Sequence, residues 1–320
     1  FTEFANFAFE EYGGKVKWWI TINEMDLIIR GYGESNSLAP NLPMNGVTDY
    51  QAAYNLLRAH GKAYRLYQYN YKRTQRGKVG LAVAAQYSVP LDPYSAEDIA
   101  AVDRQNQFQI GLFAHPVFSK EGNYPLVVRE RVDLNSRQEG RNSSRLPHFT
   151  PQEIQELRGS YDFFGLNHYF TYFVTSGLES GGPSRSRDSG TIIQETKTLG
   201  SGLRGVLKWI RTTYNNPPVF VTENGFNTDS AFNDTARVEF YHDYIGEMLK
   251  AIYNDGCSVI GYTAWSIMDN FEWGDGYTSK FGIWRVDFNN PQRPRTKKLS
   301  AYYFKQLAQT RQLPRIPFTL

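Results

Sequence analysis

The chain has 320 residues and lacks the features that several classes of protein require. It holds a single cysteine, Cys257, so neither an internal disulfide nor a cysteine-ligated metal site can form. No apolar run approaches the roughly 20 residues that cross a bilayer, and we expect no membrane span. No His-Glu-x-x-His motif is present, and no expected strand leads into a glycine-rich nucleotide-binding turn. We therefore expect neither a metal nor a cofactor.

A strong charge of one sign is also missing. The net charge is +3 and the basic residues are scattered, which argues against a nucleic-acid partner. Aromatic residues, by contrast, make up 15% of the chain. Aromatic rings stack against sugars, but they also fill large cores, so this composition alone favours a ligand site only weakly.

Two short patterns and the start of the chain bear on where the protein resides. The triplets that begin at Asn142 and Asn233 are N-glycosylation acceptor sequences, so both asparagines are glycosylation candidates and are compatible with secretion. The chain opens on Phe1 with neither a start methionine nor a signal peptide, and we expect that an upstream segment is missing.

Apolar extended runs alternate with helical patterns along the whole chain. Five runs predict strands, at residues 15–24, 78–87, 161–170, 219–223 and 258–266. Strands that are apolar on both faces and separated by helices indicate a parallel sheet covered by helices. The fold class is therefore α/β, with five strand–helix units.

Two stretches between these units carry local signals. Thr150, Pro151 and Glu153 form a capping box with proline at the first helical position, which predicts the start of a helix. Residues 176–190 are rich in serine and glycine. This composition indicates a segment too polar to pack against the core, and it is longer than a simple loop between two elements needs to be. We therefore expect a mobile flap near a functional site.

Two of the strands end on a glutamate. The run "WWITINE" ends at Glu24, and "VFVTEN" carries Glu223. In a parallel barrel the carboxyl ends of all strands open on one face, where active sites are built, so the two carboxylates can share a pocket. Paired carboxylates suit glycoside hydrolysis, in which one group donates a proton and the other stays ionised. The alternative is that each glutamate caps a helix or pairs with an arginine.

At these residues the chain resembles family 1 glycoside hydrolases, the β-glucosidase and myrosinase group. The resemblance extends along nearly the whole chain, and the motifs are most similar to those of the animal, especially insect, branch of the family. The matching segments are "WITINE", "GLFAHPVF", "DFFGLNHY", "VFVTENG", "TAWSIMDNFEW" and "RPRTKKLSAYYFK". It implies a (β/α)8 TIM barrel in which residues 1–320 form a single catalytic domain and supply strands four to eight.

The resemblance also implies roles for individual residues. Glu24 would be the acid/base and Glu223 the nucleophile of a retaining mechanism that passes through a covalent glycosyl-glutamate. Six residues would bind substrate or steady the nucleophile: Asn23, Asn167, Tyr169, Trp265, Glu272 and Trp273. Glu272 would accept hydrogen bonds from the outer hydroxyls of the sugar and repel a 6-phosphate, so an unphosphorylated glycone is expected.

The chain departs from the family pattern in two places. The family usually has proline after the acid/base, whereas this chain has Met25 and then Asp26, whose charge would raise the pKa of Glu24 if it points inward. The first three strand–helix units of the family have no counterpart. Five strands cannot close an eight-stranded barrel, so we expect the chain alone to be unstable and weakly active or inactive.

The expected function is hydrolysis of β-D-glucosides, with β-galactosides or β-fucosides as further possible substrates. Myrosinase activity on thioglucosides is the alternative within the enzyme class. A non-catalytic protein that binds a sugar or aglycone is the alternative outside it. The resemblance implies a secreted protein with a small β-glycoside as its partner, and leaves open whether it is a monomer or a homodimer.

Overall fold

A five-stranded parallel sheet forms the centre of the computed structural model, which describes residues 1–33, 38–229 and 232–319. The strand order is β1-β2-β4-β7-β8, and every pairing between neighbours is parallel. The strands are β1 (Trp18–Asn23), β2 (Lys78–Ala84), β4 (Phe163–Asn167), β7 (Val219–Asn224) and β8 (Val259–Ala264). All five expected strands are confirmed, and every start and end lies within three residues of its expected position.

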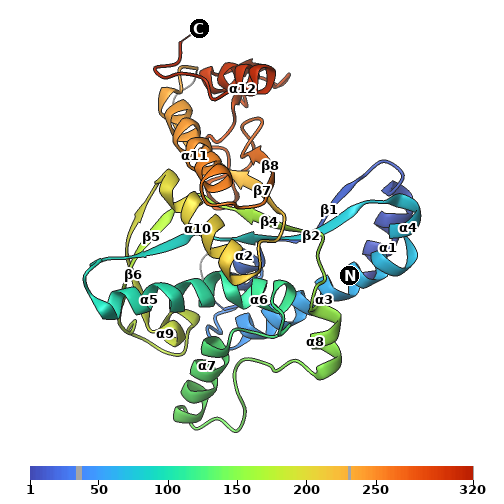
Figure 1. Ribbon diagram of the computed structural model, residues 1–320, viewed down its shortest axis with the longest axis vertical. Coiled ribbons are helices and arrows are strands. Elements are labelled where there is room, and N and C mark those ends of the chain that lie inside the picture. Colours follow the sequence, from blue (N-terminus) through green and yellow to red (C-terminus); the bar gives the residue numbers. More distant parts are fainter. Residues whose placement is uncertain (34–37, 230–231, 320) are drawn as a thin grey trace.

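Helices connect these strands and cover the outer face of the sheet (Figure 1). The longer ones are α1 (Thr2–Tyr12), α3 (Thr48–Asn70), α5 (Ala96–Asn106), α7 (Leu126–Gln138), α10 (Gly200–Thr213), α11 (Thr235–Tyr253) and α12 (Leu299–Thr310). The shorter ones are α2 (Met25–Arg30), α4 (Lys72–Gln75), α6 (Leu112–Phe118), α8 (Pro151–Leu157), α9 (Arg185–Ser189), the π-helical turn η1 (Gln107–Gly111) and the 3-10 turn η2 (Trp273–Asp275). The capping box predicted at Thr150 is present at the start of α8.

The sheet is an open arc among the described residues. The central strands β2 and β4 are almost wholly buried, because helices cover one face and neighbouring strands lie on both sides. The two edge strands β1 and β8 are not: Trp18 is 48% exposed, and Ile20 and Ile260 are exposed as well. Across the concave face, the ring of Trp18 lies edge-on to Phe163 and Phe220 at centroid distances of 5.3 and 5.7 Å. The sheet is therefore curved like part of a barrel, without being closed.

Two smaller sheets lie outside the arc and were not predicted from the sequence. One has the order β3-β5-β6 and comprises β3 (Tyr87–Pro90), β5 (Thr171–Ser176) and β6 (Thr191–Lys197). The other pairs β9 (Trp284–Val286) with β10 (Arg295–Lys297). The first extends the carboxyl ends of β2 and β4, and therefore adds a wall on the side where the site lies.

The expectation that residues 176–190 are too polar to pack was wrong for their second half, whereas residues 176–182 are largely exposed. The second half forms α9, in which Arg185 and Asp188 are buried. Arg145 binds both carboxylate oxygens of Asp188, at 2.8 and 2.6 Å, and each side chain of this pair is only 1% exposed. The Tyr50 hydroxyl donates a further hydrogen bond to Asp188, at 2.8 Å. Charged partners from distant parts of the chain neutralise the segment and allow it to pack.

Among the described residues, no helix is both long and apolar enough to span a bilayer. The same residues contain no cluster of histidine, cysteine, aspartate and glutamate that could hold a metal ion.

Candidate active site

The carboxyl ends of three strands bring together the polar residues that the sequence singled out. Asn23 ends β1, Asn167 ends β4, and Glu223 lies one residue before the end of β7. In the register of the sheet, Asn167 lies opposite Glu223. Because the arc is curved, Asn23 reaches Glu223 although two strands separate β1 from β7.

Glu223 is held by hydrogen-bond donors on both carboxylate oxygens. The Tyr169 hydroxyl donates to Oε2 at 2.8 Å, and the Asn23 side-chain amide donates to Oε1 at 3.2 Å. Asn23 is itself fixed by the amide of the buried Asn167, at 3.1 Å, and Asn167 accepts from the Thr222 hydroxyl at 2.5 Å. This chain of contacts fixes the orientation of the Glu223 carboxylate and favours its ionised form.

Tyr169 is positioned by residues that the sequence did not suggest. The side-chain carbonyl of Gln86 accepts from the backbone N–H groups of Tyr169 and Phe170, at 2.8 Å each. The Tyr244 hydroxyl donates to the backbone carbonyl of Tyr169 at 2.9 Å. The only signal for Gln86 was its position, just after the apolar run of β2. Its role depends on a contact between distant segments.

Glu24 occupies the turn between β1 and α2. Its backbone has φ 51° and ψ 62°, a left-handed conformation that is uncommon for residues other than glycine. Its N–H still donates to the Ala82 carbonyl in the neighbouring strand β2, at 3.0 Å, and its carbonyl accepts from Leu27 at 3.0 Å. Met25, in the place of the family's usual proline, is almost fully buried. The hydrogen bonds to Ala82 and from Leu27 thus hold Glu24 in a strained backbone conformation at the carboxyl end of β1.

The surroundings of the two glutamates raise the pKa of both carboxyl groups, through different balances of burial, charge and hydrogen bonds. Burial, followed by the charge of Glu223, raises the pKa of Glu24 to about 7, and the smaller contribution of Asp26 has the same sign. Burial also raises the pKa of Glu223, and hydrogen bonds from Tyr169 and Asn23 limit the rise. Near neutral pH, Glu24 is therefore the better proton carrier and Glu223 is the carboxylate that its neighbours keep charged.

Trp265, Glu272 and Trp273 line the same cavity as Glu24 and Glu223. The Trp265 indole N–H donates to Glu272 Oε1 at 3.1 Å. Burial raises the pKa of Glu272, while the hydrogen bonds from Trp265 and Asn270 lower it. Trp273 is 71% exposed, so its ring is free to cover a bound ligand and is not part of the core.

The cavity that these residues border has a volume of about 280 Å³. It is lined by Glu24, Asp26, Leu27, Arg30, Ala84, Gln86, Gln109, Tyr169, Phe170, Tyr172, Glu223, Trp265, Glu272, Trp273 and Phe281. Carboxylates and several aromatic rings line the cavity together, which suits it to a sugar. All eight residues predicted to be catalytic or substrate-binding lie in or directly behind this cavity.

The two glycosylation candidates lie elsewhere. Asn142 is exposed in the connection between α7 and α8, and Asn233 is exposed next to the first turn of α11. Neither lines the cavity. Both positions are accessible, and glycosylation itself stays a prediction.

Comparison with known proteins identifies the family. The model of glycosyl hydrolase family 1 matches residues 1–313. Myrosinase 1 of Brevicoryne brassicae is 40% identical over 322 residues, covering 97% of this chain and 68% of that protein. The human cytosolic beta-glucosidase is 36% identical over 319 residues, covering 96% of this chain and 68% of that protein.

A solved structure of aphid myrosinase superimposes with a TM-score of 0.92 at 39% identity, covering 96% of this chain and 68% of that one. The strand–helix units described above therefore belong to a (β/α)8 barrel, of which this chain supplies an open part. By its sequence, its fold and the residues at its strand ends, the chain belongs to glycosyl hydrolase family 1.

Proposed function

We propose that this chain carries the active site of a retaining β-glycosidase, with Glu223 as the nucleophile and Glu24 as the acid/base. One observation carries the assignment. In a single cavity, Glu223 is held by two hydrogen-bond donors, whereas burial and the charge of Glu223 raise the pKa of Glu24 to about 7. The mechanism needs one carboxylate that stays ionised and one carboxyl group that holds a proton.

In the first step the Glu223 carboxylate attacks the anomeric carbon of the substrate. The bond from that carbon to the glycosidic oxygen breaks, and Glu24 gives its proton to the departing oxygen. In the second step Glu24, now ionised, takes a proton from water as the water oxygen attacks the same carbon. The ester to Glu223 breaks, Glu24 regains its proton, and the sugar leaves with its original anomeric configuration.

The remaining residues would recognise the sugar. Asn23, next to both carboxylates, would donate a hydrogen bond to the 2-hydroxyl group in addition to its bond to Glu223. Glu272 would accept from the outer hydroxyls, and its position is set by Trp265. A carboxylate there repels a phosphate group, which supports an unphosphorylated glucoside, galactoside or fucoside as the substrate.

Thioglucoside hydrolysis is the second candidate, because the chain is 40% identical to a protein named Myrosinase 1. A thiolate leaves with little protonation, so this reaction makes less use of an acid at position 24. The two candidates are separated by comparing kcat/KM for p-nitrophenyl β-D-glucoside and for a thioglucoside. A non-catalytic sugar-binding protein would bind glucose and turn over neither.

Two further points about the whole protein belong to this proposal. The exposed apolar side chains on β1 and β8 support additional strands that join these edges and complete the catalytic domain. The two accessible asparagines support secretion, although one similar protein is named a cytosolic enzyme.

The stereochemistry of the reaction tests the proposal. The full-length protein is mixed with p-nitrophenyl β-D-glucoside, and the first product is observed by proton NMR before glucose mutarotates. The β-anomer is the expected initial product. An initial α-anomer would exclude a glycosyl-Glu223 intermediate, and no turnover by folded protein would favour the binding function.

A further inference from the structure

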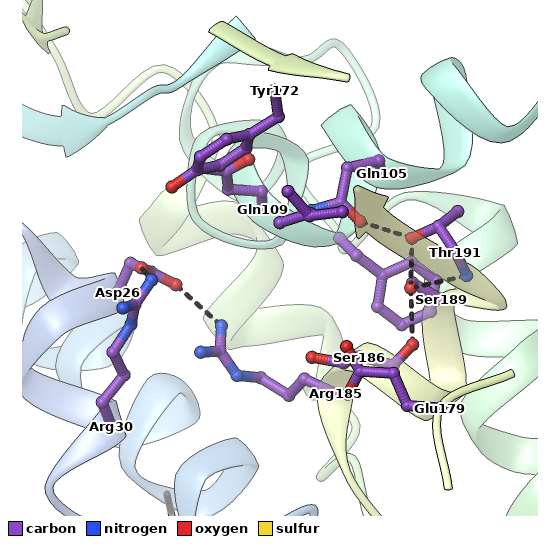
Figure 2. A pocket seen from close by; sticks show the side chains of 12 residues that line it. Asp26, Arg30, Gln105, Gln109, Tyr172, Glu179, Arg185, Ser186, Ser189 and Thr191 are labelled. Atoms are coloured by element: carbon purple, nitrogen blue, oxygen red, sulfur yellow. Dashed lines mark hydrogen bonds and ion pairs between the residues drawn. The ribbon is translucent and has the colours of Figure 1, made fainter. Parts of the chain in front are cut away.

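Arg185 connects the short helix α9 to the first turn of α2, which begins directly after the acid/base. Its Nη1 atom donates to Asp26 Oδ1 at 2.8 Å, and this bond joins residues 159 positions apart (Figure 2). Arg30 donates to the other carboxylate oxygen of Asp26, at 3.0 Å. Because Arg30 belongs to α2 itself, its bond does not tie the helix to another element. The bond from Arg185 does.

The pair of Asp26 and Arg185 is buried, with side chains that are 4% and 9% exposed. Burial alone would raise the pKa of Asp26, but the charges of Arg185 and Arg30 hold it below its ordinary value. Asp26 is therefore ionised at neutral pH. Hydrogen bonds between ionised partners are short and directional, so this contact fixes the distance between α2 and α9.

Helix α9 is itself held in place by a second buried cluster. Arg145 binds both carboxylate oxygens of Asp188, at 2.8 and 2.6 Å, and Asn135 of α7 donates to the same carboxylate at 2.8 Å. The Nε atom of Arg185 also lies 3.6 Å from a carboxylate oxygen of Asp49 in α3. Contacts with α3, with α7 and with the segment that follows α7 thus make α9 an anchor for α2.

The backbone that carries the acid/base needs such an anchor. Glu24 has a left-handed conformation, which persists only where the surrounding structure imposes it. Met25 follows, and no ring fixes its φ angle. Met25 and Ile29 pack in the core, but apolar contacts have no preferred direction. The bond to Asp26 is directional, and it acts two residues from the acid/base.

We propose that Arg185 is a positioning residue for the acid/base: through Asp26 it fixes the start of α2, and so sets the position of the Glu24 carboxyl group. This inference rests on the proposed function, since it requires Glu24 to be the acid/base of a glycosidase. Arg185 does not line the catalytic cavity, and its effect passes through Asp26, which does. A displacement of about 1 Å in a reacting group can lower a rate about 100-fold.

Two aryl glucosides distinguish a misplaced acid from a general loss of activity. Phenyl β-D-glucoside needs a proton on its departing oxygen, whereas 2,4-dinitrophenyl β-D-glucoside releases a stable phenolate without one. In the full-length protein, we expect Arg185→Met to lower kcat/KM for the phenyl glucoside about ten- to hundredfold, with less than a threefold change for the dinitrophenyl glucoside. Competition between the two substrates in one reaction makes the ratio of these values independent of the fraction of folded enzyme.

The matched control is Arg187→Met. It removes another arginine of α9, which donates to the backbone carbonyls of Glu179 and Gly181, at 3.3 and 3.0 Å, and does not line the cavity. The control should keep the wild-type ratio. A control that changes the ratio as much as Arg185→Met would show that any disturbance of α9 has this effect, and would overturn the inference.

The dinitrophenyl glucoside gives a second readout. Its leaving group departs easily, so hydrolysis of the glycosyl-enzyme limits kcat, and Glu24 is the base in that step. A misplaced Glu24 lowers kcat and KM together, by about tenfold, and nearly preserves kcat/KM. Loss of folded enzyme would instead lower kcat and leave KM unchanged, and that result in Arg185→Met would contradict the inference.

A double variant tests whether Arg185 acts through Asp26. Asp26→Leu removes both acceptor oxygens, so adding Arg185→Met to it should change the ratio of the two substrates by less than about twofold. A further tenfold change would contradict the proposed route.

Glu24→Gln separates this inference from the proposed function. It should lose the phenyl glucoside selectively, and more strongly than Arg185→Met does. If Glu24→Gln shows this selective loss and Arg185→Met lowers both substrates equally, or neither, the inference alone is overturned. If Glu24→Gln shows no selective loss, or the wild-type protein hydrolyses neither substrate, the proposed function is wrong and the inference fails with it.

Discussion

The hydrogen bond from Tyr169 to Glu223 provides a quantitative test of the assignment of the nucleophile. Tyr169→Phe removes the hydroxyl that donates to Glu223 Oε2 at 2.8 Å and keeps the ring, which packs edge-on against Phe281. Hydrogen bonds to charged groups contribute about 1.5–3 kcal/mol. The substitution removes that stabilisation from the ionised form of Glu223 and so raises the pKa of its carboxyl group.

The loss of this hydrogen bond should change the pH profile of kcat/KM mainly on its acidic side. At low pH, kcat/KM is proportional to the ionised fraction of the nucleophile. A loss of about 1.5–3 kcal/mol therefore lowers kcat/KM roughly ten- to hundredfold on the acidic limb. The loss is smaller near the optimum, where Glu223 is already ionised. The alkaline limb, set by loss of the proton from Glu24 near pH 7, should move much less.

The assay is kcat/KM for p-nitrophenyl β-D-glucoside between pH 4 and 9, with thermal unfolding of each variant measured in parallel. Tyr54→Phe is the matched control, because its hydroxyl also donates to a carboxylate, Glu153 Oε1, at 2.8 Å, but outside the cavity. The control should keep the wild-type profile. An acidic limb in Tyr169→Phe that stays in place or moves to lower pH would refute the reasoning.

Three further predictions concern other charged groups. The pKa of Glu24 is raised in the folded protein to about 7, so its ionisation destabilises the fold as the pH rises from about 4.5 to 7. Glu24→Gln should therefore increase the free energy of unfolding, measured by urea denaturation, by about 2–3 kcal/mol at pH 8 and leave it nearly unchanged at pH 4. An equal change at both pH values would contradict this. Glu272→Gln removes the charge that repels phosphate. The value of kcat/KM should therefore fall about tenfold or more for p-nitrophenyl β-D-glucoside, and should fall less for its 6-phosphorylated counterpart. Equal decreases would show that the charge of Glu272 does not discriminate between the two substrates. Arg145→Met leaves Asp188 buried without its cation and should lower the free energy of unfolding by about 3–5 kcal/mol. The control Arg141→Met removes an arginine that is 39% exposed and pairs with Glu139, and should lower it by less than about 1 kcal/mol. Similar decreases in the two variants would show that the buried pair does not stabilise the fold.

The strand ends could be predicted because two local signals coincide there. Apolar runs mark the buried strands, and Glu24 and Glu223 follow such runs directly. In a parallel sheet, this alone places both on one face. The family motifs then supplied the surrounding residues. Tyr169, Trp265, Glu272 and Trp273 line the cavity, and Asn23 and Asn167 reach Glu223 through hydrogen bonds without lining it.

The remaining parts depend on contacts that leave no local pattern. Residues 176–190 look like a solvated loop because Arg185 and Asp188 have no partner nearby in sequence, yet Asp26 and Arg145 neutralise them from other segments. The β5–β6 pair was missed because most of β6 is exposed and polar, so it shows no apolar alternation. The π-helical turn η1 was missed because nothing in the sequence of residues 107–111 indicates one.

The most direct test of the account is to trap the covalent intermediate. The full-length protein is incubated with an activated 2-deoxy-2-fluoro-β-D-glucoside, whose fluorine slows formation and hydrolysis of the glycosyl-enzyme, and the modified peptide is mapped by mass spectrometry. The account predicts one fluoroglucosyl group, attached to Glu223. An adduct on any other residue, or no adduct on folded protein, would contradict it.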